Sequence, residues 1–66
     1  MSKEYTGPNT DELMEDVVSL INEVNEDWKK VKEKHNAAAG RRIRKALDDI
    51  ARIKVDVRKA MLKEGR

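Results

Sequence analysis

Apolar residues recur along most of this 66-residue sequence at alternating intervals of three and four. That spacing aligns one row of side chains on a single face of an α-helix. No stretch alternates with a period of two, so no β-strand is expected. The first row is Met14, Val17, Ile21, Val24, Trp28 and Val31, and the second row is Ala39, Ile43, Ala46, Ile50, Ile53, Val57 and Ala60. The sequence therefore predicts an all-α protein built from two helices.

The first helix is predicted over residues 10–34, after a short polar segment. Residues 1–9 contain a Gly-Pro pair and are expected to form a flexible N-terminal arm. Asn9 or Thr10 is a suitable N-cap, and Glu12 stands three residues after Asn9, as a capping box requires.

The second helix is predicted over residues 37–64, with a turn at 35–36. Asn36 is a suitable N-cap for it, and Gly65 is a suitable stop. His35 is expected to cap the turn or to lie partly buried in it. Because the connection is short, the two helices should lie antiparallel as a coiled-coil-like hairpin over residues 10–64.

One antiparallel pair of helices buries little apolar surface, which is hardly enough to offset the conformational entropy lost on folding. A further partner is therefore expected. We predict a two-fold dimer of hairpins that forms a four-helix bundle and displays its basic surfaces outward. The apolar residues that flank the two rows, and that we expect at this interface, are Leu13, Val18, Leu20, Val55, Met61 and Leu62.

Size and composition exclude most catalytic chemistry. A chain of 66 residues seldom builds a shaped pocket with a supporting shell, so no enzyme and no small-molecule substrate are expected. With no cysteine and one histidine, neither a metal site nor a cofactor is expected. No apolar run approaches the roughly 18 residues of a membrane span, so we expect a cytoplasmic protein.

Charge is distributed in blocks along the sequence. Residues 11–28 hold seven acidic side chains and no basic one, whereas residues 29–45 hold eight basic side chains and a single acid, Glu33. A net charge of +7 at the hairpin tip favours a polyanionic partner. The alternative is a solvated basic face that balances the acids of the first helix.

The tip is the first candidate binding site. Arg41, Arg42, Arg44 and Lys45 open the second helix, where positive charge opposes the helix dipole. An anion site explains them, because free backbone N–H groups at a helix N-terminus also bind phosphate. The first helix contributes Lys29, Lys30, Lys32 and Lys34 to the same end.

A second candidate is a basic stripe along the second helix, which consists of Lys45, Arg52, Lys59 and Arg66, with Arg44 and Arg58 beside them. Such a stripe can follow a phosphate backbone without reading sequence, although the exposed face of any soluble helix also looks like this. Trp28 is expected in the helix interface, and Tyr5 is the sole other aromatic residue, so duplex DNA suits the chain better than single strands. Gly40 indicates a close approach, either of the other helix or of a phosphate.

The segment from His35 to Leu47, HNAAAGRRIRKAL, followed by Val57-Arg58-Lys59, resembles the bacterial linker-histone-like proteins, the chlamydial histone-like family. Position 37 is Ala where the family pattern has Lys, and Arg41 is an added charge. The resemblance implies sequence-nonspecific DNA binding and compaction without catalysis. The matching positions that it implies are Asn36, Ala38, Ala39, Gly40, Arg42, Arg44, Lys45, Arg58 and Lys59.

These observations predict a nucleoid-associated protein that binds double-stranded DNA without sequence preference through phosphate contacts. If the gene is carried by a bacterial virus, the bound DNA would be viral. The alternative is a coiled-coil module that recognises a protein partner and does not bind DNA.

Overall fold

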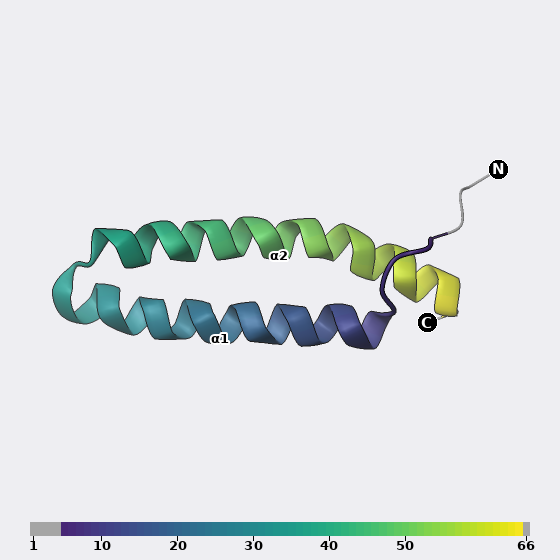
Figure 1. Ribbon diagram of the computed structural model, residues 1–66, viewed down its shortest axis with the longest axis horizontal. Coiled ribbons are helices and arrows are strands. Elements are labelled where there is room, and N and C mark those ends of the chain that lie inside the picture. The colour runs from purple at the N-terminus through teal and green to yellow at the C-terminus, as the bar shows by residue number, and fades with distance from the viewer. Residues whose placement is uncertain (1–4, 66) are drawn as a thin grey trace.

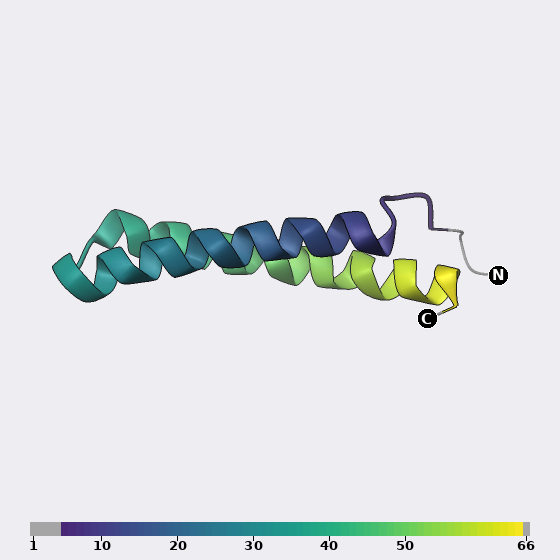
Figure 2. The same cartoon turned by 90° about the horizontal axis from the view of Figure 1, so that it is seen from below.

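The computed structural model of the protein describes residues 5–65 and shows a hairpin of two long helices. Helix α1 spans Thr10–Lys34 and helix α2 spans Ala37–Glu64. They lie antiparallel and side by side in a rod of 51 × 19 × 14 Å (Figures 1 and 2). The predicted all-α, two-helix fold is confirmed. Part of the predicted flexible arm, residues 1–4, and Arg66 of the predicted stripe lie outside the described residues.

Local hydrogen bonds set the ends of both helices. Asn9 Oδ1 accepts from the backbone N–H of Glu12 at 2.9 Å, and the backbone N–H of Asn9 donates to Glu12 Oε1 at 3.3 Å, which completes a capping box. Asn36 caps α2 by accepting from the backbone N–H of Ala39 at 3.0 Å. His35 ends α1 in the left-handed conformation with φ 49°, and its side chain is exposed. Gly65 ends α2 in the same conformation, where glycine carries no steric penalty.

The contact between the helices follows the predicted row on α2. Every member of that row, from Ala39 through Ala60, is buried or half-buried. Three of the seven are alanines, and Ala39, Ala46 and Ala60 are the ones that are fully buried. The inward row on α1 consists of Thr10, Leu13, Val17, Leu20, Val24, Asp27 and Val31.

The predicted row on α1 is wrong at every second position. Met14, Ile21 and Trp28 are exposed, by 40%, 50% and 51%. Their places in the contact are taken by the residues one position earlier, Leu13, Leu20 and Asp27. The predicted row and the observed row both contain the valines at 17, 24 and 31. Either row is therefore compatible with the three-and-four spacing.

The same rotation of α1 corrects the residues expected at a dimer interface. Leu13 is buried and Leu20 is half-buried within the hairpin, so neither flanks the core as predicted. Val18, Val55 and Leu62 are exposed, and Met61 is half-buried.

The open end of the hairpin is held by polar contacts from the last turns of α2. Glu64 Oε2 accepts from the backbone N–H of Thr10 at 3.0 Å, which places a carboxylate at the positive end of α1. Lys63 Nζ donates to the backbone oxygen of Tyr5 at 2.8 Å. These contacts connect the start of α1 and the segment before it to the end of α2.

Candidate nucleic-acid interface

The turn gathers the predicted basic residues at one end of the rod. The last turns of α1 and the first turns of α2 lie next to each other at the end opposite the two termini (Figure 1). All eight side chains of this basic tip are exposed: Lys29, Lys30, Lys32, Lys34, Arg41, Arg42, Arg44 and Lys45.

Half of the basic tip is already paired with carboxylates of the protein. Lys29 Nζ lies 3.6 Å from Glu26, and Lys45 Nζ lies 3.9 Å from Asp49. Arg42 and Lys30 both approach Asp27, at 3.0 Å and 4.0 Å. A cation in such a pair has to break or weaken its contact with the carboxylate when it binds a phosphate.

The other half makes no ion pair with any residue from 5 to 65. Lys34, Arg41 and Arg44 are exposed and carry no such contact, and Lys32 Nζ stands 6.0 Å from the ring centre of Trp28. The first turn of α2 also contains no acidic residue. The structure therefore leaves uncompensated positive charge around a helix N-terminus, where phosphate binds well.

The predicted stripe on α2 divides into two parts. Lys45 and Arg52 approach Asp49 from the two sides along the helix, with Arg52 Nη1 at 3.5 Å. Arg58 and Lys59 are exposed and make no ion pair with the described residues. Residues 45, 52 and 59 lie on one long side of the hairpin, and residues 44 and 58 lie on the other. The two sets differ by one position in the sequence, and one residue turns the helix by about 100°.

The two long sides of the hairpin differ in chemistry. On α1 we consider the residues that directly follow Leu13, Leu20 and Asp27, and on α2 those that directly follow Ala39, Ala46 and Ala60. Because the helices are antiparallel, these two sets lie on the same long side of the hairpin. We call this the apolar side. Its exposed apolar residues are Met14, Val18, Ile21, Trp28 and Leu47, and its cations are Lys32, Arg44, Lys54 and Arg58.

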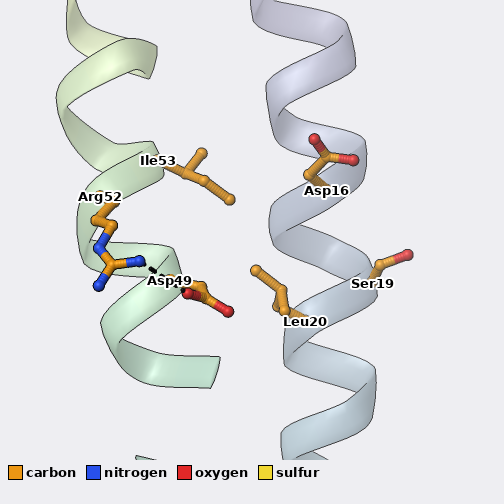
Figure 3. Close-up of a pocket in the computed structure, with 6 residues that line it drawn as sticks. All are labelled: Asp16, Ser19, Leu20, Asp49, Arg52 and Ile53. Carbon is orange, nitrogen blue, oxygen red and sulfur yellow. Dashed lines mark ion pairs between the residues drawn. The ribbon is translucent and has the colours of Figure 1, made fainter. Parts of the chain in front are cut away.

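The opposite side, which we call the acidic side, carries acids of both helices. Figure 3 shows an open groove on this side, in which Leu20 of α1 and Ile53 of α2 face each other. Asp16 borders the groove on one helix, and the paired Asp49 and Arg52 border it on the other. This side also carries the cations Lys45, Arg52 and Lys59, which partly offset the charge of its acids.

Lys54 is a candidate that the sequence interpretation missed. It lies on the apolar side of α2, it is exposed, and it has no ion-pair partner among residues 5–65. It stands between Arg44 and Arg58 along the helix. The signal in the sequence was its spacing of four residues from Arg58, which places both cations on neighbouring turns.

Gly40 faces open space within the hairpin. A Cβ atom added there would meet no atom within 4 Å, so close approach of α1 is not the reason for this glycine. Approach of a phosphate to Gly40, the other predicted reason, stays a prediction.

Replacing Gly40 by alanine is therefore expected to stabilise the hairpin. Alanine in a helix is favoured over glycine by about 1 kcal/mol. The midpoint of thermal unfolding, followed by circular dichroism, should rise by about 4–8 °C. A midpoint that falls would contradict the open environment of this position.

No three histidine or carboxylate side chains among residues 5–65 are grouped as a metal site requires. Neither described helix is long and apolar enough to cross a membrane.

The structure is a small helical hairpin whose turn end carries uncompensated positive charge, a feature that is common in proteins that bind polyanions. Comparison with known proteins identifies the family within that class: residues 11–66 match the family described as histone H1-like protein Hc1, so the chain belongs to this family of histone-like DNA-binding nucleoid proteins. Such proteins are typically not enzymes. No curated protein and no solved structure matches the chain.

Proposed function

We propose that the protein binds double-stranded DNA through phosphate contacts, without sequence preference. The observation that carries this proposal is the set of uncompensated cations at the basic tip, Lys34, Arg41 and Arg44, next to a helix N-terminus without acids. Membership of the histone-like family supports DNA as the polyanion. Aromatic residues that would stack on unpaired bases are nearly absent.

Cations along α2 extend this contact surface. From Arg44 to Arg58 the helix rises by about 21 Å, at about 1.5 Å per residue, and both cations lie at the outer edge of the apolar side, so they stay exposed when that side is covered. That length matches several successive phosphates of a duplex, which carries one charge per roughly 1.7 Å of axis. The predicted contacts Arg52 and Lys59 lie around the other edge of α2, and Lys29, Lys30 and Lys45 surround the tip.

We also propose that the apolar side of the hairpin binds a second copy of the chain. The buried apolar residues of the described hairpin are Leu13 and three alanines, so its core contains a single large apolar side chain at this level of burial. Such a core is small for an independent fold of this length. Pairing two apolar sides would cover Met14, Ile21, Trp28 and Leu47 and form a four-helix bundle.

Charge favours the antiparallel arrangement of the two hairpins in this dimer. A parallel arrangement would place two tips of net charge +7 side by side, whereas an antiparallel two-fold arrangement sends them to opposite ends. A dimer with two separated tips bridges two segments of duplex. We place this activity on the nucleoid, or on viral DNA if a bacterial virus encodes the chain.

The test is the affinity of the protein for two unrelated random-sequence duplexes across a series of salt concentrations. The logarithm of the association constant should fall linearly with the logarithm of salt, equally for both duplexes. Each phosphate contact adds about 0.9 to the slope, so the tip contacts Lys34, Arg41 and Arg44 contribute about 2.7 per bound chain and the contacts along α2 add to this value. Absence of binding at low salt would overturn the proposal and favour the alternative, a protein-interaction module that uses the apolar side.

A further inference from the structure

The contact between the two helices contains one charged side chain, Asp27. It belongs to the inward row of α1, and its side chain is 12% exposed. The fully buried residues of the described hairpin include no other charged group. Removing a carboxylate from water is costly unless charged hydrogen bonds replace the lost hydration.

Arg42 supplies these hydrogen bonds from α2. Its Nε donates to both carboxylate oxygens of Asp27, at 3.2 Å and 3.3 Å, and its Nη2 donates to Oδ1 at 3.0 Å. Two guanidinium N–H groups therefore reach this carboxylate, and such charge-assisted hydrogen bonds are stronger than those between neutral groups. Lys30 Nζ is farther away, at 4.0 Å. Arg42 is therefore the main partner of this carboxylate.

The pair also accounts for the rotation of α1. Turning α1 by one row would bury Trp28 and remove Asp27 from the contact, which apolar burial alone would favour. The observed arrangement buries Asp27 and leaves Trp28 51% exposed. Asp27 can pair with Arg42 only when it faces α2, so the ion pair stabilises the observed rotation of α1 relative to the alternative one.

Contact of Arg42 with a phosphate of DNA would cost the protein the Asp27–Arg42 pair, whereas contact of Arg44 would not. If the Arg42 guanidinium turned to a phosphate, the Asp27 carboxylate would stay at the helix contact with only the more distant Lys30. Arg44, two residues later on the same helix, has no ion-pair partner among residues 5–65 and is exposed. It can contact a phosphate without breaking an existing pair.

We infer that Arg42 is a positioning residue rather than a phosphate contact. By holding Asp27, it fixes how α1 and α2 are rotated at the tip. Arg41 and Arg44 then point away from the helix contact, and Trp28 remains on the apolar side. This assignment rests on the proposed DNA binding, and it removes one of the predicted contacts from the binding surface.

The experiment compares Arg42→Gln with the matched control Arg44→Gln, which removes the same charge two residues away. Arg42→Gln should lower the midpoint of thermal unfolding by about 8 °C or more, because it leaves a carboxylate at the helix contact without its main partner. Its salt slope for duplex binding, measured below that midpoint, should stay as in the wild type. Arg44→Gln should leave the midpoint nearly unchanged and reduce the slope by about 0.9 per bound chain.

A double variant keeps the test valid if Arg42→Gln does not fold. Asp27→Leu combined with Arg42→Leu replaces the ion pair by apolar side chains, a change that often preserves or raises stability. This variant should fold and retain the wild-type salt slope. A slope lowered by about 0.9 in the folded double variant would show that Arg42 contacts phosphate and would overturn the inference.

The stability measurements are independent of DNA. Asp27→Asn should remove most of the effect of Arg42→Gln on the unfolding midpoint, because the two side chains act as one unit. Additive effects would overturn the inference. If the wild-type chain bound no duplex while the two positions remained coupled, the proposed function would fail and the structural pairing would stand.

Discussion

Replacing Lys34, Arg41 and Arg44 together by glutamine is expected to weaken binding to a random-sequence duplex by about two to three orders of magnitude at about 0.1 M salt. These three side chains make no ion pair with residues 5–65, and Lys32, the fourth such cation of the basic tip, is left in place because it lies beside the Trp28 ring. Each lost phosphate contact removes about 0.9 from the salt slope, so the slope should fall by about 2.7 per bound chain. Fluorescence anisotropy of a labelled duplex across a salt series measures both quantities.

A matched variant separates the tip from the overall charge of the protein. Lys29, Lys45 and Arg52 are three cations that already lie near Glu26 or Asp49. Replacing these three by glutamine removes the same total charge, and we expect a clearly smaller loss of affinity. Equal losses in the two triple variants would show that net charge, rather than the uncompensated tip, determines binding.

Replacing Ile21 by aspartate is expected to weaken self-association of the chain by about 100-fold or more, because a two-fold interface would bury the new charge twice. Ile21 is 50% exposed in the hairpin and stands in the middle of the apolar side. The fold of a single hairpin should therefore tolerate the change. Sedimentation equilibrium of wild type and variant measures the effect on the dimer.

Val55→Asp provides the control for this substitution. Val55 is 49% exposed, nearly the same as Ile21, but it projects away from the apolar side. This variant should dimerise like the wild type.

Salt should strengthen wild-type dimerisation, since the cations around the apolar side, Arg44, Lys54 and Arg58, repel those of the second copy. A wild-type chain that is monomeric at micromolar concentration would contradict the proposed dimer.

The ends of the helices were predictable because they depend on neighbouring residues. Asn9 with Glu12, Asn36 with Ala39, and Gly65 all act within one helical turn. The sequence patterns therefore coincide with observed hydrogen bonds. The inward row of α2 was predictable for a related reason, since the residues on either side of that row are mostly polar.

The inward row of α1 was not predictable, because α1 has two apolar rows that share the central valines. One of them contains Met14, Ile21 and Trp28, and the other contains Leu13 and Leu20. Hydrophobic spacing favours the first row, since the second also contains Asp27. The observed choice follows the pairing with Arg42. Periodicity within α1 says nothing about this contact, because its partner lies on the other helix.

The sequence by itself determined two helices, the turn between them and a cationic end, because capping, periodicity and charge blocks are local properties. The tertiary structure decided that Arg42 pairs with Asp27 and which side of the hairpin is apolar. Those properties depend on the rotation of α1 against α2, and that rotation is set by contacts between residues far apart in the chain. The ion pairs of Lys29, Lys30, Lys45 and Arg52 instead join residues three or four positions apart on one helix, so they follow from local spacing.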